Sequence, residues 1–279
     1  GGVALNVLLN WILIWGKFGV PAMGLEGAGL ATLLARIATL AVLINWCRNS
    51  RTMHDWVPRR WFRPPDGPSI GSLVKVGLPA SLQLLAEVSA FVMATMLIGT
   101  IGKISLASHQ VAITCATTVF MVPLGLSMAL TVRIGEAWGA KRLDRLRPLV
   151  ASGWIIGASF TVLSALTILV FPNVIAGWFI TDPEARRLSA TLLVISAAFQ
   201  FSDAMQIISM GALRGLDDVH LPAWLAVFTY WGVSIPVGAW LAFALGWGAP
   251  GMWWGITVGL TLTAIMLGWR LWRKSAAPI

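Results

Sequence analysis

Residues 149–172 read LVASGWIIGASFTVLSALTILVFP, an apolar run without a charged side chain. An α-helix needs about 20 such residues to cross roughly 30 Å of hydrocarbon, so this run is long enough to span a membrane. The whole chain has the same character, because 57% of its 279 residues are hydrophobic and only 11% are charged. Its mean hydropathy is +0.80, and its apolar runs are too long for the alternating strands of a membrane β-barrel. The sequence therefore predicts an all-α integral membrane protein, a polytopic helical bundle.

Apolar segments separated by turns rich in Gly and Pro recur along the chain. We expect eight of them, at residues 3–15, 26–46, 76–101, 105–132, 149–172, 189–213, 221–246 and 250–271. Most of the 20 Lys and Arg residues fall in one alternate set of loops. The positive-inside rule places those loops and the C-terminus in the cytoplasm, as in a multi-pass protein of the cell inner (plasma) membrane. The same sorting accounts for the net charge of +9, so the expected partner is the lipid bilayer and not nucleic acid.

Two parts of the sequence echo each other. Residues 11–24 read WILIWGKFGVPAMG and residues 240–253 read WLAFALGWGAPGMW. Each holds the end of a helix, a Gly-rich turn and the start of the next helix, a pattern typical of transporters built from repeats. If a six-helix unit ends near residue 271, we expect an equivalent unit before it, of which roughly four N-terminal helices are missing. This organisation predicts the end of the first unit, a basic Pro-rich cytoplasmic linker, a six-helix unit and a cytoplasmic tail at residues 1–46, 47–70, 71–272 and 273–279.

Two acids, Glu87 and Asp203, lie inside predicted spans that carry no other acid. An ionisable group at the centre of a span costs ~2.5 to 3.5 kcal/mol on insertion scales, which favours a functional use for it. A carboxyl group in such surroundings can exchange a proton for a cation. The alternative is that each acid only hydrogen-bonds a neighbouring helix and fixes packing, at ~0.6 to 2 kcal/mol for each bond.

Amide side chains accompany both acids. Gln83 precedes Glu87 by four residues and shares its helix face. Gln200, Asp203 and Gln206 are spaced by three and predict one polar stripe. Such a stripe on an apolar span faces protein or a water-filled cavity, unless it serves packing alone. Two acids on different helices, each with amide neighbours, suit a cavity for an organic cation, and we expect these three glutamines to line it.

Aromatic residues and one histidine complete the candidate set. Phe199 precedes Asp203 by four residues and lies on the same side of the predicted helix. Phe91, Phe120 and Phe199 are candidates to stack on a bound cation, although each taken singly is more simply explained as core. His109 opens a span, and a lone His in that place is expected to be a hydrogen-bonded structural residue rather than a proton relay.

Motifs for catalysis do not occur in the sequence. It has no Walker A phosphate loop, no HExxH pair and no CxxC pair. Asp217 and Asp218 could hold magnesium, but no further acid follows them at metal-binding spacing, so a capped turn is the better interpretation. We therefore expect neither an enzyme nor a bound cofactor, and transport by this chain would have to run on an ion gradient.

Several segments together resemble the multidrug and toxic compound extrusion (MATE) transporters, especially the NorM-type branch. They are GLPASLQLLAEVSAF, IGTIGKISLASHQVAITCATTVFMVPLGLSMALTVRIGEAWGA, AAFQFSDAMQIISMGALRG and GKFGVPAMGLEGAGLAT, at residues 77–91, 98–140, 197–215 and 16–32. The resemblance implies twelve helices in two six-helix lobes around a central cavity. On that basis the chain carries the last two helices of the N-terminal lobe and the whole C-terminal lobe.

The resemblance also implies a secondary active antiporter. It would export cationic amphipathic drugs or toxic compounds while sodium ions or protons flow inward, and the missing N-terminal lobe would complete its cavity. By motif match, Glu87 and Asp203 are the cation-coupling acids of the C-terminal lobe, and a sodium site at these two residues is one form of the coupling. Some relatives have Tyr where this chain has Phe199. This chain therefore lacks one hydroxyl that could bind sodium.

Rival functions remain open. A flippase of the same superfamily, moving a lipid-linked oligosaccharide, would be expected to line its cavity with cations, and Arg36 is the only cation in the middle of a span. An intramembrane lipid-modifying enzyme would need a polar cluster with a metal or a nucleophile near one interface. A structural or receptor bundle would use the two acids for packing alone.

Overall fold

The computed structural model describes residues 1–50 and 66–276, and every regular element within these ranges is a helix. Seven of the described helices are long and apolar enough to cross a membrane, and the helix at the N-terminal end is shorter. The prediction of an all-α membrane bundle is confirmed. The chain forms two compact units, residues 1–66 and residues 67–279.

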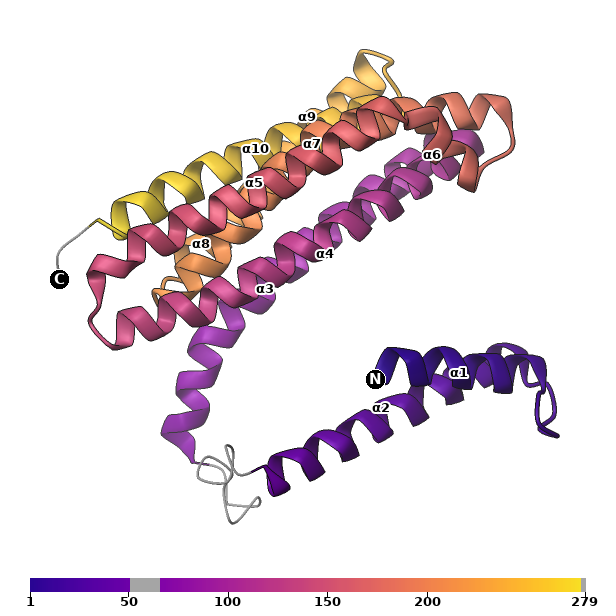
Figure 1. Cartoon of the computed structure of the whole chain (residues 1–279). Coiled ribbons are helices and arrows are strands. Elements are labelled where there is room, and N and C mark those ends of the chain that lie inside the picture. The colour runs from indigo at the N-terminus through magenta and orange to yellow at the C-terminus, as the bar shows by residue number, and fades with distance from the viewer. Residues whose placement is uncertain (51–65, 277–279) are drawn as a thin grey trace. The chain divides into compact units, whose positions relative to one another are not determined.

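Unit 1 is a helical hairpin of α1 (Gly2–Trp15) and α2 (Gly24–Asn49) (Figure 1). Gly16 ends α1 with a φ of 65°, a left-handed conformation that a residue without Cβ adopts at little cost. The turn is closed by Met23, whose backbone N–H donates to the carbonyl of Leu13 at 3.0 Å. Residues 27, 31 and 35 of α2 are Gly, Ala and Ala and are all buried, so a face of small residues lets the two helices approach closely.

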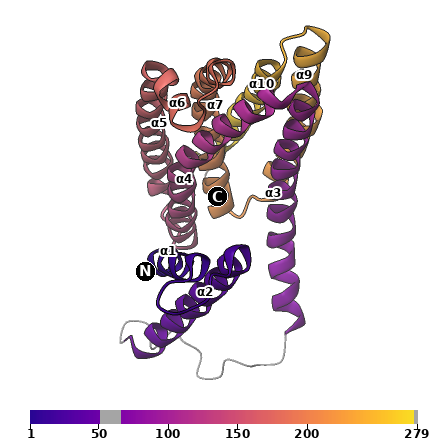
Figure 2. The ribbon, with the colours of Figure 1, turned by 90° about the vertical axis from the view of Figure 1, so that its right-hand side faces the viewer.

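Unit 2 contains six spans. The bounds of its elements are α3 (Gly67–Ile101), α4 (Lys103–Gly139), η1 (Leu143–Arg145), α5 (Leu146–Val170), α6 (Pro172–Phe179), α7 (Pro183–Gly215), α8 (His220–Val227), η2 (Phe228–Ser234), α9 (Ile235–Ala239), η3 (Trp240–Ala244) and α10 (Ala249–Lys274). The elements from α8 to η3 join into one continuous span, in which η2 and η3 are π-helical. Helices α3 and α5 stand at opposite sides of unit 2 (Figure 2).

Helix α7 is the centre of unit 2. It packs against α4, α10, α5 and α6, and most of its length is buried. Hydrogen bonds between helices hold it in place, since Ser127 Oγ donates to the carbonyl of Ile207 at 2.7 Å and Thr131 Oγ1 donates to that of Gly211 at 2.8 Å. In apolar surroundings such bonds and the close approach of small residues stabilise helix pairs. The outer helices instead expose large apolar side chains, as expected of surfaces that face hydrocarbon.

The observed helices differ from the predicted ones mainly at their ends. Helix α4 continues to Gly139 and α7 starts at Pro183, because polar first and last turns also form helix beyond the apolar run. Asp182 caps α7 by accepting a hydrogen bond from the Ala185 N–H at 2.8 Å. Helix α6 was not predicted as a separate element; Pro172 starts it, and Trp178 is exposed on it. The predicted linker, 47–70, falls mostly on residues 51–65, which lie outside the described residues.

Candidate cation-binding site

Glu87 on α3 and Asp203 on α7 come together in unit 2. Asp203 is only 7% exposed and Glu87 is half-buried. Their carboxylates are close enough for the charges to interact. In the part of the chain that the structure describes, neither acid forms a salt bridge or accepts a side-chain hydrogen bond from a basic residue. Two carboxyl groups thus lie within electrostatic range of each other without a basic partner among the described residues.

Antiparallel register between α3 and α7 explains why these side chains meet. Four residues beyond Glu87, Phe91 places its ring edge-to-face against Phe199, with centroids 6.1 Å apart. Four residues before Glu87, the buried Gln83 lies in a small recess with Met210. The partner of Phe91 lies four residues before Asp203 and that of Gln83 lies seven residues after it, and spacings of four and seven keep side chains on one face of a helix. Moving forward on α3 thus corresponds to moving backward on α7. Because α3 packs chiefly against α8 and α4, long side chains form the connection between α3 and α7.

Tyr230, which the sequence analysis did not select, lies beside the two acids. It is 1% exposed, and its hydroxyl accepts a hydrogen bond from Gln206 Nε2 at 2.9 Å. Its ring lies 6.4 Å from that of Phe91, and its hydroxyl is within electrostatic range of Glu87 and Asp203. Tyr230 belongs to the π-helical segment η2, and π-helical turns within helices occur frequently at functional sites.

His109 is held by hydrogen bonds at both ring nitrogens. Trp253 Nε1 donates to Nδ1 at 3.2 Å, and Nε2 lies 2.9 Å from Thr95 Oγ1. The Thr95 hydroxyl donates to the carbonyl of Phe91 at 2.8 Å, so it accepts from His109. The ring is therefore neutral with its proton on Nε2. These contacts fit the structural role expected for His109. The Trp253 ring also packs against that of Phe199, and the centroids of these two rings are 5.6 Å apart.

Gln200 and Phe120 are not brought to the acids. Gln200 Oε1 accepts a hydrogen bond from Ser164 of α5 at 3.0 Å, whereas Gln206 faces Tyr230. The single polar stripe predicted from the spacing of three is therefore wrong. Each residue turns an α-helix by about 100°, so a step of three falls about 60° short of a full turn. Two such steps separate the directions of Gln200 and Gln206 by about 120°, and the two side chains reach different neighbouring helices. Phe120 packs at the margin of the core on α4, and within the described ranges its ring contacts neither Phe91 nor Phe199.

Tyr230 and Trp253 are thus the residues that sequence reasoning missed. One signal was available for Tyr230, because it is the only tyrosine of the chain and lies in an apolar span, where its hydroxyl needs a partner. Trp253 is one of 16 tryptophans, and the sequence does not separate it from the others. The described residues contain no group of three or more His, Cys, Asp or Glu that could hold a metal ion. The arrangement offers negative charge, amide and phenol groups, and aromatic faces.

Comparison with known proteins identifies relatives. Residues 79–240, more than half of the chain, match the family model described as MatE. A protein of Rhizobium meliloti (strain 1021), named "Probable multidrug resistance protein NorM", is 38% identical over an aligned length of 285 positions, which covers 99% of this chain and 61% of that protein. A protein of the same name from Burkholderia pseudomallei (strain K96243) is also 38% identical, over 99% of this chain and 59% of its own length. The chain thus spans about six-tenths of the length of these relatives.

Solved structures share the fold. The crystal structure of the eukaryotic MATE transporter AtDTX14 matches 99% of this chain and 61% of its own chain, with a TM-score of 0.89 at 22% identity. The Vibrio cholerae MATE transporter VcmN in its bent form matches 98% of this chain and 60% of its own, with a TM-score of 0.82 at 21% identity. At this level of identity the likeness concerns the fold alone.

Proposed function

The chain belongs to the MatE family, and from this membership we propose that the whole protein is a secondary active antiporter that exports cationic amphipathic compounds in exchange for sodium ions or protons. The family resemblance seen in the sequence is confirmed by the family match and by the relatives named NorM. The observation that carries the proposal is the interacting pair of acids, Glu87 and Asp203, without a basic partner among the described residues and beside buried aromatic rings.

The mechanism that we propose is competition for negative charge. A coupling ion, sodium or a proton, neutralises Glu87 and Asp203 in one state of the transporter, and a cationic substrate takes its place in the other. Tyr230, which is within electrostatic range of both acids, and Gln206, which hydrogen-bonds Tyr230, offer oxygen atoms to the ion. Phe91 and Phe199 offer ring faces and edges to the apolar part of the substrate. In this mechanism we expect the N-terminal lobe that the family resemblance implies to close the cavity from the other side.

The driving force depends on the net charge that moves. Exchange of one inward cation for one exported monovalent cation moves no net charge, so the concentration gradient of the coupling ion alone would drive it. With two coupling ions for each exported molecule, one net elementary charge moves inward, and 100 mV then adds ~2.3 kcal/mol, which corresponds to about a fifty-fold concentration ratio at about 1.4 kcal/mol for each tenfold step.

Neutralising either acid tests the site. We expect Glu87→Gln and Asp203→Asn, each in the full-length protein, to lower the initial rate of cationic dye export from cells at least tenfold. The reason is that the amides keep size and hydrogen bonding but carry no charge for the ion to neutralise. Dye efflux is measured together with membrane expression and the thermal unfolding midpoint.

The matched control for this experiment is Glu184→Gln, an exposed acid in the first turn of the same helix as Asp203. It removes one negative charge from α7 and should leave export unchanged. Export at the wild-type rate by both site variants would contradict the assignment. A similar loss in the control would show an effect of net charge and would also count against the site.

Reconstitution identifies the coupling ion. The purified full-length protein in liposomes is given a proton gradient or a sodium gradient, and dye movement is followed. We expect one of the two gradients to drive export and the double variant Glu87→Gln/Asp203→Asn to abolish that response. Export driven equally in the absence of both gradients would exclude antiport.

The competing functions receive less support. A flippase for lipid-linked sugar phosphates needs positive charge where the substrate binds, whereas the groups that converge between α3 and α7 are acidic. The relatives are named as multidrug resistance proteins, and we propose that the protein is a transporter without enzymatic activity. We also place it in the cell inner membrane with a cytoplasmic C-terminus, on the charge sorting of its loops.

A further inference from the structure

The connection between α4 and α5 forms a basic pocket of about 390 Å³. Its charged lining consists of Arg133 and one acid, Glu136, from the end of α4, together with Arg142 and Arg145 from the connection. The chain reverses at Lys141, which has a φ of 57°, and the turn is closed by a hydrogen bond from the Arg142 N–H to the Ala137 carbonyl at 2.8 Å. This turn brings the three guanidinium groups to one pocket although they are distributed over two helical segments.

The positive charge of the pocket is little compensated. Arg133 Nη1 lies 3.3 Å from Glu136 Oε2, but these side chains are 71% and 61% exposed, and an exposed pair of this kind contributes less than about 1 kcal/mol. Arg142 and Arg145 form no ion pair within the described residues. Guanidinium groups bind phosphate through two parallel N–H donors. This lining therefore suits a phosphate group better than an uncharged apolar ligand.

The floor of the pocket is apolar. Ala137 and Leu149 line it from the two helices, and both lie where α4 and α5 enter the bundle. A ligand that fits has an anionic head for the arginines and an apolar part for these side chains. A volume of about 390 Å³ falls in the usual range of ligand pockets, roughly 300 to 1,000 Å³.

Tryptophan residues show that this end of unit 2 lies at the membrane surface. The α4–α5 connection and the C-terminal end of α10 lie at the same end of the unit (Figure 1). There the Arg147 guanidinium lies over the Trp272 ring at 5.1 Å, Trp154 stacks on Trp272 at 6.0 Å, and Arg273 lies over Trp269 at 4.6 Å. Tryptophan and arginine side chains concentrate at the depth of the lipid headgroups. We therefore expect the pocket to lie at the depth where phospholipid phosphates occur.

We propose that this pocket binds the phosphate of an anionic phospholipid headgroup, with Arg133, Arg142 and Arg145 around the phosphate and Leu149 against the start of the lipid chains. Basic pockets between transmembrane helices hold such headgroups through the same chemistry. The site lies at the opposite end of α4 from His109 and does not depend on the proposed transport function.

Lipid titration of the full-length protein in a neutral detergent tests this proposal. Phosphatidylglycerol, phosphatidylcholine with the same acyl chains, and inorganic phosphate alone are added in separate arms. Bound lipid is measured by native mass spectrometry, and the thermal unfolding midpoint is recorded. We expect phosphatidylglycerol to bind at least tenfold more tightly than phosphatidylcholine, and its affinity to fall as salt is raised.

A pair of matched variants locates the binding. Arg142→Gln/Arg145→Gln should lower the affinity for phosphatidylglycerol at least tenfold and leave that for phosphatidylcholine unchanged. The control Lys103→Gln/Arg187→Gln also removes two positive charges, but at exposed positions that do not line the pocket. It should change the affinity for phosphatidylglycerol less than twofold.

Four outcomes would overturn the proposal. They are no preference for the anionic lipid, no salt dependence of its binding, an equal loss in the control variant, and saturation of the site by inorganic phosphate with no added affinity from the lipid. The first two need only the wild-type protein, so the test stands even if the pocket variant fails to fold.

Discussion

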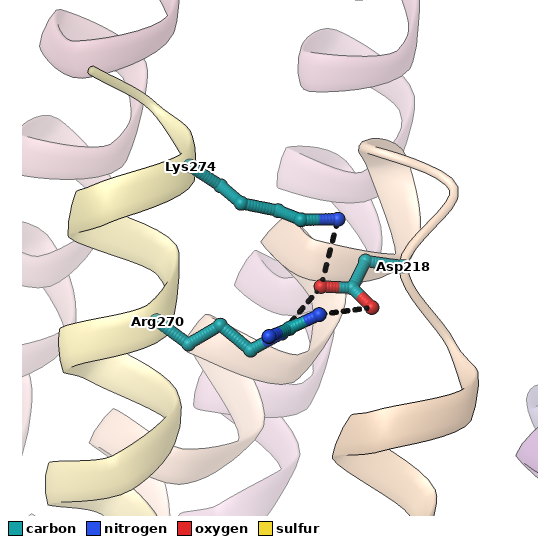
Figure 3. A network of polar contacts seen from close by, with 3 residues as sticks. All are labelled: Asp218, Arg270 and Lys274. Carbon is teal, nitrogen blue, oxygen red and sulfur yellow. Dashed lines mark hydrogen bonds and ion pairs between the residues drawn. The ribbon is translucent and has the colours of Figure 1, made fainter. Parts of the chain in front are cut away.

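Asp218 shows how a single side chain joins two elements of the bundle. It lies in the short turn between α7 and α8, where Oδ2 accepts a hydrogen bond from Arg270 Nε at 2.6 Å and Oδ1 accepts one from Arg270 Nη2 at 3.1 Å. Lys274 Nζ lies 3.0 Å from Oδ2 (Figure 3). Burial of the carboxyl group favours its neutral form, but the hydrogen bonds and charges of Arg270 and Lys274 outweigh burial and hold the pKa of Asp218 below its ordinary value of 3.8.

Asp218→Asn should therefore destabilise the protein. We expect a loss of about 1 to 2 kcal/mol at pH 7, because charged hydrogen bonds of this kind contribute about that much and Lys274 is partly exposed. A carboxyl group whose folded pKa is lowered stabilises the fold above its unfolded pKa, and this contribution is lost as pH falls through the folded value. The difference between variant and wild type should thus begin to shrink below about pH 4 and disappear only below the lowered pKa of folded Asp218.

Thermal unfolding in detergent between pH 7 and pH 3 measures this difference. The control is Glu136→Gln, which removes an acid from an exposed pair and should cost less than about 0.5 kcal/mol. Equal stability of Asp218→Asn and wild type at pH 7 would show that the contact in Figure 3 does not contribute to folding.

At the scale of the helix, α10 depends on small residues. Its buried glycines at positions 251, 255 and 259 are four apart and face the end of the preceding span. A Cβ at Gly255 would meet the backbone of Gly238, and one at Gly259 would meet the Ser234 side chain. Such spacing of small residues allows helix backbones to pack closely in membranes. It was present in the sequence as a four-residue repeat, but the sequence alone does not say which helix faces it.

Gly255→Ala should disrupt this packing. The added methyl group would meet the backbone of Gly238, which cannot rotate away as a side chain can. We therefore expect the free energy of unfolding to fall by at least about 2 kcal/mol, or the protein to fail to accumulate in the membrane. Gly125→Ala in α4 is the control, since nothing lies within 4 Å of the added Cβ; the exchange should be neutral or stabilise by up to about 1 kcal/mol. Detergent unfolding and expression level are the measurements. A tolerated Gly255→Ala would contradict the packing between α10 and α9.

The membrane-spanning helices could be predicted from the sequence because the thickness of the hydrocarbon layer sets the length of the apolar run that each one needs. Long apolar runs fixed the existence and type of the spans, and the cost of a buried charge selected Glu87 and Asp203. Tyr230 and Trp253 were not found, because their place beside Phe91 and Phe199 depends on which helices are neighbours. A spacing of three predicts Gln200 on the same face as Asp203, whereas the helix turns Gln200 toward Ser164 of α5. The π-helical segments have no pattern in apolar sequence that separates them from α-helix.

At the scale of the whole molecule, the basic residues give the chain a direction in the membrane. We expect the C-terminus in the cytoplasm, because Arg270, Arg273 and Lys274 end α10 and positive charge remains on that side. A green fluorescent protein fused after residue 279 of the full-length protein should fluoresce, and an alkaline phosphatase fused there should be inactive. The reverse pair of results would invert every loop. The same two fusions placed in the turn between η3 and α10, at residues 246–248, serve as the control and should give the opposite signals.

The span from α8 to η3 has a further consequence. Where hydrogen bonds run from i to i+5, the chain uses one residue more for a turn than an α-helix does. If the same residues of η2 (Phe228–Ser234) wound as an ordinary α-helix, all that follows would turn by about 100° about the axis. Gly238 would then point away from Gly255. The extra residue in the π-helical turn therefore keeps Gly238 toward α10, and losing one residue from an α-helical part of this span would turn the rest in the same way.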